Sequence, residues 1–431
     1  MNVTVGIWGV VILVLLLLGQ VPVAIALIAV AFGGITFLLG FTPALGILMN
    51  TPYSFVASWT MSAVPMFLLM GFVAYHAGLT TGLFEAAKVV LRKIPGGLAV
   101  SAVFACSGFA AVCGSSLACA AAMGRIAIPE MVAAGYRPSV ACGSIAAGGT
   151  IGALIPPSIL MIIYGIIAET SVTQVFIGGI SIGLLTAFSY VVVIIMISWL
   201  RPDLIPRHSA NEKKGSVKAL IGIWPTIALI VLVFGGLFSG FFSATEAGAV
   251  GALGAVILGI ITRGLTGKAV QQSLLETVLT TSSLFIIAVG ASMFTRFLGI
   301  SGLSGFINSA VAGADLSYAE LMLLIVLIYL ILGTFMEPFG AMLVTLPVFL
   351  PILKSEGISL VWFGVLVVKL LEIGMITPPF GLNVFVIRNV AAQYATVVQI
   401  FRGVVPFFFA DLVVVFIAVA YPQIVLAFVQ P

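Results

Sequence analysis

Charged residues are scarce in this chain. Of its 431 residues, 7% are charged and 62% are hydrophobic, whereas soluble domains carry about 25% charged residues. Such a composition cannot keep a surface of this size in water, so it excludes a soluble protein. The formal net charge of +4 comes without a basic patch interleaved with aromatic residues. We therefore interpret it as a signal of membrane topology rather than of nucleic-acid binding.

Histidine and cysteine are also rare. The two histidines, His76 and His208, lie far apart, and the four cysteines have neither zinc-site nor redox spacing. The cysteines are Cys106, Cys113, Cys119 and Cys142. So few and so widely spaced histidines and cysteines disfavour a metal centre and a Ser-His-Asp triad. They therefore disfavour an enzyme acting inside the membrane. We predict that the cysteines pack as small apolar residues and that His76 lies in the core or at an interface.

Apolar sequence is present in long runs. Runs of about 17 to 25 residues, the length that a spanning helix requires, recur along the whole chain. No basic segment precedes the first run, residues 3–19, which argues against a cleaved signal peptide. The composition and the runs together predict an all-α polytopic membrane protein.

One stretch of the sequence occurs twice. Gly114-Ser115 recurs later in the chain as Gly333-Thr334, and the twin proline Pro156-Pro157 recurs as Pro378-Pro379. The separation along the sequence between the two twin prolines is slightly longer than that between the two glycine pairs. Because the two intervals differ, we expect one short insertion between the copies. In a bilayer, backbone loosened by proline and glycine is tolerated only where it is buried in protein or lines a wet cavity. Paired breaks in the two halves of a membrane chain indicate the substrate and ion sites of a transporter.

The predicted fold has two inverted-topology repeats, residues 1–200 and 219–431, joined by a linker at 201–218. Each repeat contains about five spanning helices, an amphipathic interfacial arm, a re-entrant hairpin and a helix broken at Pro-Pro. In the first repeat the arm, hairpin and broken helix fall at 79–95, 98–129 and 143–167, and in the second they fall at 298–314, 321–352 and 360–387. Each hairpin piece has about 15 residues, fewer than the roughly 20 that a crossing needs. The polar face of the first arm is expected to carry Glu85, Lys88, Arg92 and Lys93.

Basic residues predict the orientation in the membrane. The linker carries Arg201, Arg207, Lys213, Lys214 and Lys218. The positive-inside rule therefore places it in the cytoplasm. Five crossings in each half then place both termini in the periplasm and invert the halves relative to each other.

The breaks predict two Na⁺ sites. Half-helices that meet at the midplane expose N–H groups to an anion and carbonyl groups to a cation, and hydroxyl and carbonyl oxygens suit a hard cation. The first site would use Gly114, Ser115, Ser116, Thr150 and Gly152. The second site would use Gly333, Thr334, Glu337, Gly374 and Thr377.

Ionisable residues inside a membrane are functional candidates by default. Glu337 lies beside a proline in an apolar hairpin, and it could ligate an ion, carry a proton or serve as a hydrogen-bonded structural carboxylate. The residues predicted to contact a substrate are Ser116, Pro157, Glu337 and Asn383. Asn383 could donate to a substrate carboxylate or cap backbone. Weaker candidates are Glu246, Arg296, Lys369, Glu372 and Asp411.

Six segments carry a distinctive ordered set of motifs. They are GFAAVCGSS at 108–116, MGRIAIPEM at 123–131, GGTIGALIPPSILMIIYG at 148–165, SATEAGAV at 243–250, GTFMEPFGAMLVTLPVFLPI at 333–352 and ITPPFGLNVFVI at 376–387. Together they resemble the large membrane subunit of a tripartite ATP-independent periplasmic (TRAP) transporter over essentially the full length. Ala244 stands where that family usually has proline.

The resemblance implies an elevator-type, Na⁺-driven importer of an organic acid, such as a C4-dicarboxylate or sialic acid, in the bacterial inner membrane. It also implies two partners, a periplasmic substrate-binding protein and a small four-helix membrane subunit, which we expect as a separate chain because no such helices precede Met1. The residues alone leave open a stand-alone Na⁺/carboxylate symporter or ion antiporter of the same architecture. A passive channel is disfavoured because the breaks form two separate sites rather than a continuous polar pore.

Overall fold

A computed structural model describes residues 2–91, 93–206, 217–314 and 316–429. These residues form helices joined by turns, without a strand. Nine of the described helices are long and apolar enough to cross a membrane, which confirms the predicted all-helical, multi-pass membrane protein. His208 lies outside the described residues, as do four residues used to predict the linker and the first arm: Arg92, Arg207, Lys213 and Lys214.

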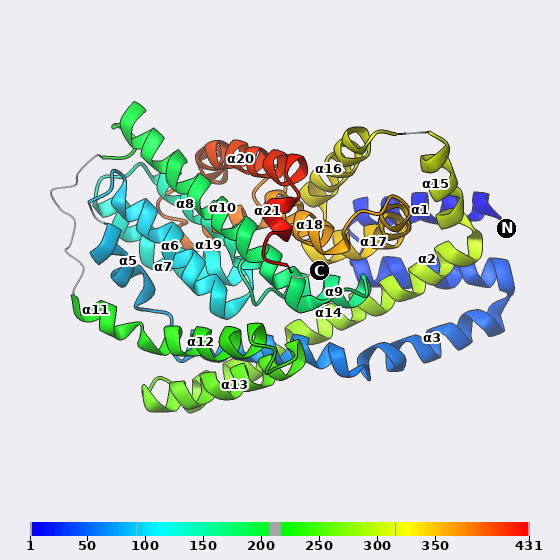
Figure 1. Cartoon of the computed structure of the whole chain (residues 1–431), viewed down its shortest axis with the longest axis horizontal. Helices are drawn as coiled ribbons and strands as arrows, with labels where there is room; N and C mark the ends of the chain where they lie inside the picture. Colours follow the sequence, from blue (N-terminus) through cyan, green and yellow to red (C-terminus); the bar gives the residue numbers. More distant parts are fainter. Residues whose placement is uncertain (1, 92, 207–216, 315, 430–431) are drawn as a thin grey trace.

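The described residues of the first half form ten α-helices (Figure 1). They are α1 (Val3–Leu18), α2 (Val23–Leu39), α3 (Phe41–Val56), α4 (Ala63–His76), α5 (Leu83–Leu91), α6 (Gly97–Cys113), α7 (Ser116–Ala133), α8 (Pro138–Thr150), α9 (Ile159–Ile167) and α10 (Val172–Leu200). Short 3-10 turns at Trp59–Ser62 and Ile151–Ala153 precede α4 and follow α8.

The described residues of the second half form eleven more helices. They are α11 (Val217–Gly222), α12 (Trp224–Phe238), α13 (Ala244–Ile261), α14 (Gly267–Ser301), α15 (Leu303–Gly313), α16 (Tyr318–Phe335), α17 (Pro338–Ser355), α18 (Leu360–Gly374), α19 (Leu382–Val390), α20 (Val397–Ala420) and α21 (Gln423–Leu426). Helices of the two halves follow one another in matching order. For example, α2 begins at Val23 and its counterpart α13 begins at Ala244.

Hydroxyl residues define where several helices begin. Ser243, Ser317 and Thr396 each accept a hydrogen bond from the backbone N–H three residues later, and the side chain at that position bonds back to the cap. Such capping boxes satisfy N–H groups at the first turn of a helix. In an apolar environment this matters more, because little water is present to do the same.

The hairpins are longer than expected. Helices α6 and α7 have 17 and 18 residues, and α16 and α17 have 18 each, where the sequence predicted about 15. At 1.5 Å per residue such helices are about 26–27 Å long, still slightly less than the roughly 30 Å hydrocarbon core. The prediction that they are re-entrant remains a prediction.

The first arm is shorter than predicted, and one of its polar residues is buried. Helix α5 has nine residues. Lys88 was expected on the polar face, but its side chain is 3% exposed, and its Nζ lies 2.6 Å from carboxylate oxygens of both Glu85 and Glu130. Two carboxylates compensate the ammonium charge, so the residue can turn inward. The second arm, α15, is likewise shorter than the predicted 298–314.

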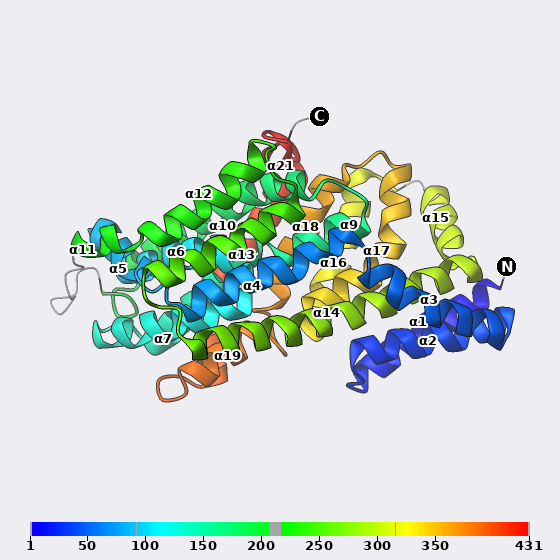
Figure 2. The ribbon, with the colours of Figure 1, turned by 90° about the horizontal axis from the view of Figure 1, so that it is seen from below.

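One matching pair of segments differs between the halves. The predicted span at Met61–Tyr75 corresponds to α4, but α3 before it was not predicted. In the second half, the same position is filled by the single 35-residue helix α14. Figure 2 shows α14 extending over much of the molecule's long axis. It packs against α2 and α4 of the first half.

The two halves interlock rather than lying side by side. Helix α20 of the second half packs on α8 of the first, and α10 of the first packs on α18 of the second. Helix α19 packs on both α7 and α8. The apolar residues around α6 to α8 form one core cluster with α19 and α20, so each broken helix is supported by elements of the opposite half.

Candidate functional site

The tip of the first hairpin is a two-residue turn. Helix α6 ends at Cys113, Gly114 takes a left-handed conformation with φ of 62°, and Ser115 is the N-cap of α7. The Ser115 hydroxyl accepts a hydrogen bond from the Ala118 N–H at 3.4 Å. Glycine is the residue that adopts this backbone conformation without steric cost. The tip therefore presents hydroxyls and backbone groups together.

Glu337 forms the tip of the second hairpin. It is the N-cap of α17, and its carboxylate accepts hydrogen bonds from the N–H groups of Gly340 at 2.7 Å and Phe339 at 3.3 Å. Glu337 is thus the structural counterpart of Ser115, because each caps the second helix of its hairpin. Thr334 lies earlier, in the last turn of α16, where its hydroxyl donates to the Ile331 carbonyl at 2.7 Å.

These positions correct the register of the repeat. The pairing of Gly114-Ser115 with Gly333-Thr334 was wrong, since the second pair belongs to a helix and the first to a turn. The interval from the cap Ser115 to the cap Glu337 equals the interval between the two twin prolines. The predicted insertion between the copies is therefore not needed.

Both broken helices are interrupted at the twin prolines, as the sequence predicted. Backbone at 154–158 separates the turn after α8 from α9, and 375–381 separates α18 from α19. Each twin proline contains a cis peptide bond. A Cβ at Gly152 would lie 2.9 Å from the Ser115 carbonyl oxygen, and one at Gly374 would overlap the backbone of Gly333. Glycine at these two matching positions lets each break approach its own hairpin tip.

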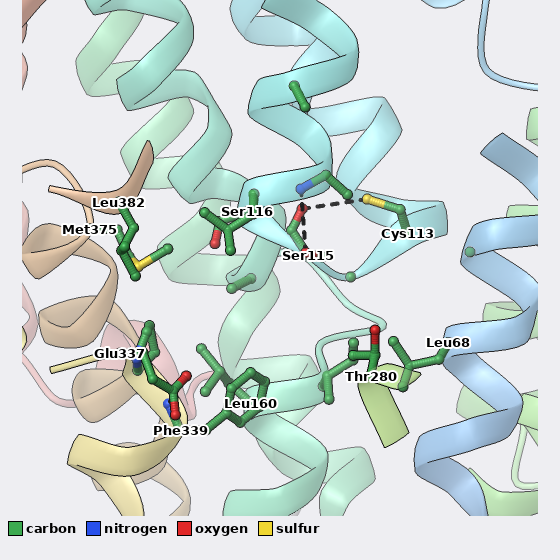
Figure 3. Close-up of a pocket in the computed structure, with 18 of the residues that line it drawn as sticks. Leu68, Cys113, Ser115, Ser116, Leu160, Thr280, Glu337, Phe339, Met375 and Leu382 are labelled. Atoms are coloured by element: carbon green, nitrogen blue, oxygen red, sulfur yellow. Dashed lines mark hydrogen bonds between the residues drawn. The ribbon is translucent and has the colours of Figure 1, made fainter. Parts of the chain in front are cut away.

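A cavity of about 410 Å³ lies between the two tips. Both halves line it, and its polar lining includes three aliphatic hydroxyl residues and three acidic ones, with no Lys or Arg among the described residues. These residues are Ser115, Ser116, Thr280, Glu276, Glu337 and Glu372. Figure 3 shows Ser115 and Ser116 on one side of the cavity and Glu337 on the other.

A smaller cavity of about 130 Å³ adjoins the second tip. Four of the residues predicted for the second Na⁺ site line it: Gly333, Thr334, Glu337 and Gly374. Thr377 does not line it, and its hydroxyl donates to the Ile373 carbonyl at 2.6 Å. Glu337 lines both cavities.

Glu372, a weaker candidate in the sequence, lies at the cavity between the tips. Its side chain is fully buried in the cavity wall, and its Oε1 accepts a hydrogen bond from the Ser116 hydroxyl at 3.2 Å. Its Oε2 has no hydrogen-bond partner among the described residues. Ser116 and Glu372 come from opposite halves of the chain, so their proximity could not be read from local spacing.

Thr150 belongs to a separate buried network. Its hydroxyl donates to the Ala147 carbonyl at 2.7 Å and lies 3.2 Å from the Tyr190 hydroxyl. Tyr190 in turn donates to Oδ2 of Asp411 at 2.8 Å, and Lys369 donates to Oδ1 at 2.5 Å. The Thr150 side chain is therefore not directed at the first tip, and Tyr190 was not among the predicted residues.

The remaining predicted residues are dispersed. Asn383 is fully buried, donates to the Ala146 carbonyl at 3.2 Å and has an Oδ1 with no partner among the described residues. Pro157 is buried, and its carbonyl lies against Gly114. Glu246 caps α13 with Ser243 at the surface.

Three of the other sequence features also have a defined place. Arg296 lines a third cavity, of about 420 Å³, to which α3, α9, α14 and α17 contribute. The His76 Nε2 lies 3.2 Å from Glu276 Oε1. All four cysteines are free and buried, which confirms that they pack in the core.

Known proteins match this chain along nearly its whole length. The family described as "Tripartite ATP-independent periplasmic transporter, DctM component" matches residues 10–424. The C4-dicarboxylate TRAP transporter large permease protein DctM of Pseudomonas aeruginosa is 37% identical over 404 residues, which cover 90% of this chain and 93% of that protein. The sialic acid TRAP transporter large permease protein SiaM of Vibrio cholerae is 32% identical, with 86% of each chain covered.

Two further similarities concern a fusion and a fold. The isethionate TRAP transporter permease protein DctMQ of Oleidesulfovibrio alaskensis is 31% identical over 96% of this chain and 65% of its own length. The crystal structure of the YdaH transporter of Alcanivorax borkumensis has a similar fold, with a TM-score of 0.66, 16% identity and 90% of each chain covered. The matched family and the relatives together show that this chain is a TRAP transporter large permease subunit of the DctM family, and therefore a transporter component rather than an enzyme.

Proposed function

We propose that the chain carries out Na⁺-coupled uptake of an organic acid across the bacterial inner membrane. The observation that carries this proposal is the cavity between the two hairpin tips, to which both halves contribute hydroxyl and carboxylate oxygens. A substrate held there would contact the moving parts of both halves at once. Ser116 of the first tip and Glu337 of the second line this cavity and are the proposed contacts, whereas Pro157 and Asn383 do not line it.

The residues present fit Na⁺. Hydroxyl, carboxylate and carbonyl oxygens are the ligands that hard cations prefer, and a buried carboxylate oxygen, Oε2 of Glu372, lacks a partner among the described residues. When bound, Na⁺ would supply the positive charge that an anionic substrate needs beside a lining that carries only acidic side chains among its described charged residues. Gly114, Ser115, Ser116, Gly152 and the carbonyl of Thr150 would hold one ion. Gly333, Thr334, Glu337 and Gly374, which line the smaller cavity, would hold the other.

The proposed substrate class rests on the names of three relatives. These three are named for C4-dicarboxylate, sialic acid and isethionate, which are organic anions. A cavity of about 410 Å³ is within the usual size of small-molecule sites. We therefore propose a carboxylate or related organic anion of this size.

The partners and the movement are proposed from the family and the arrangement of helices. The family is one component of a tripartite periplasmic transporter, and a relative carries the name of a fused permease, DctMQ. We propose a small four-helix membrane subunit and a periplasmic binding protein as partners. The hairpins and broken helices would move against α1 to α4 and α12 to α14 as an elevator, with the two halves inverted, both termini in the periplasm and the linker 201–218 in the cytoplasm.

Sodium-dependent uptake tests the proposal. The chain would be reconstituted in liposomes with the small membrane subunit, and uptake of a C4-dicarboxylate, sialic acid or isethionate would be measured with the periplasmic binding protein present. Ser115→Ala and Thr334→Ala are each expected to raise the half-saturating Na⁺ concentration by about 10-fold, which is the loss of roughly one hydrogen-bond-strength ligand. Ser171→Ala and Thr262→Ala remove comparable hydroxyls outside the cavities and should leave it unchanged. Unchanged sodium dependence in both test variants would discard the ion sites.

The binding protein separates the two candidate transporters. Uptake that is as fast without the binding protein as with it would favour a stand-alone symporter of the same architecture. Uptake that requires it supports the tripartite system.

A further inference from the structure

We propose that Glu372 is the charged ligand of a cation site that the two halves build together, with the Ser116 hydroxyl as its second side-chain ligand and Na⁺ as its ion. This inference rests on the proposed function and adds to it a residue from α18, in the half opposite to the first hairpin tip. The site is the juxtaposition of the Ser116 hydroxyl on α7 and the Glu372 carboxylate at 3.2 Å.

The Glu372 carboxylate is buried without the partners that a buried charge requires. Its side chain has 0% exposure, and an ionised carboxylate removed from water is stable only when it is paired and hydrogen-bonded. One oxygen accepts from Ser116, and the other accepts from no described residue. A single hydroxyl does not neutralise a charge.

The basic residue closest along the helix is already engaged. Lys369 lies one turn before Glu372 on α18, and its ammonium donates to Asp411 at 2.5 Å. Asp411 also accepts from Tyr190, so this pair forms a closed arrangement of its own. No described basic side chain forms an ion pair with Glu372. If Glu372 is ionised, its compensating positive charge therefore has to come from a mobile ion.

The cavity offers that ion a place. Glu372 and Ser116 both line it, as does the carbonyl-bearing turn Gly114-Ser115 at the tip. These groups are oxygen donors of the kind that hard cations bind. A proton on Oε2 would create a buried O–H donor without an acceptor among the described residues, and an unmet donor is costly. A proton on Oε1 could be donated to the Ser116 hydroxyl, so the effect of pH on stability is the test that separates a proton from a cation.

A site assembled in this way couples the halves. Ser116 is the first residue of α7, at the hairpin tip of the first half, and Glu372 lies in the last turn of α18 in the second. Occupancy holds the first tip against the second broken helix, and loss of the ion leaves an uncompensated carboxylate between them.

Ion-dependent stability of the purified full-length chain tests the inference without transport. The melting temperature would be followed as NaCl replaces choline chloride at constant ionic strength. The wild-type protein is expected to be stabilised by Na⁺. In Glu372→Gln, which leaves the second proposed Na⁺ site intact, this stabilisation is expected to become smaller, while the melting temperature in Na⁺-free buffer stays the same or rises because the uncompensated charge is gone. A merely structural hydrogen bond predicts the reverse, a protein destabilised at every Na⁺ concentration with its Na⁺ response intact.

Further variants keep the test decisive. Ser116→Ala and Glu372→Asp, which retain the charge, should keep the Na⁺ response but raise its midpoint about 10-fold, the effect of weakening one ligand. Glu130→Gln neutralises a carboxylate outside the cavity and should leave the midpoint unchanged. A wild-type midpoint in Glu372→Gln, or stabilisation by low pH with no effect of Na⁺, would overturn the site. If wild-type uptake is still Na⁺-dependent in that case, the proposed function survives; if it is not, the function fails as well.

Discussion

The buried pair of Lys369 and Asp411 allows a sharp prediction. The Lys369 side chain is 1% exposed and that of Asp411 is 0% exposed, with 2.5 Å between Nζ and Oδ1. Removing one member leaves the other charge buried alone, which costs about 3–5 kcal/mol. We expect Lys369→Met to destabilise the protein by this amount, because Met keeps most of the side-chain volume and removes only the ammonium.

The double variant Lys369→Met/Asp411→Asn supplies the comparison. Asparagine at position 411 carries no charge, yet its amide oxygen can still accept the hydrogen bond from Tyr190. Buried ion pairs replaced by neutral groups of similar volume are often no less stable. We therefore expect the double variant to unfold near the wild-type midpoint, so that the coupling between the two substitutions is at least about 2 kcal/mol.

Denaturant unfolding in mixed detergent micelles, followed by tryptophan fluorescence, measures these differences. The fully buried Trp362 lies on α18 with Lys369 and donates to the Ala418 carbonyl at 2.9 Å, so its emission reports on this region. Additive losses in the double variant, or a loss below about 1 kcal/mol in Lys369→Met, would refute the claim that the two charges depend on each other.

Two further predictions concern the first arm and the second break. Burial lowers the pKa of Lys88, but hydrogen bonds and charge contacts with Glu130 and Glu85 outweigh it and raise the pKa above the usual 10.5. The ion pairs therefore contribute stability that is complete below pH 10.5 and is lost as the pH rises through the raised pKa. Lys88→Met should remove this pH dependence and speed amide hydrogen exchange in α5. Equal exchange rates in the variant and the wild type would contradict this prediction. Gly374→Ala places a methyl group on the Gly333 backbone and is expected to destabilise the protein by about 1–3 kcal/mol, whereas Gly267→Ala, where nothing lies within 4 Å, should be neutral by thermal unfolding.

Local signals in the sequence predicted the class of fold and the interruptions. The apolar runs predicted a multi-pass membrane protein, and the twin prolines marked both breaks because proline cannot continue a membrane helix without support. Helix α3 was missed because Asn50, Thr51 and Pro52 resemble a loop in sequence. In the structure Asn50 donates to the Gly46 carbonyl at 2.8 Å and Thr51 to that of Ile47 at 2.7 Å, so these polar groups are satisfied within the helix.

Long-range contacts in the site could not be predicted in the same way. An isolated Glu in an apolar run shows that a charge is buried, but not that Glu372 meets Ser116 of the other half or that Asp411 meets Tyr190. The register of the second tip also depended on knowing where α16 ends. Thr334 carries the expected hydroxyl, yet the cap of the next helix lies further along the chain, at Glu337.

The packing of α20 on α8 has a consequence for how the protein is made. Helix α8 ends at Thr150 and α20 begins at Val397. At about 5–20 residues per second, synthesis of α20 therefore begins roughly 12–50 s after synthesis of α8 ends. During that interval Tyr190 has no carboxylate to bond and the small-residue face of α8 has no helix to cover it. The nascent first half therefore has to be shielded by lipid or the insertion machinery until its C-terminal complement leaves the ribosome.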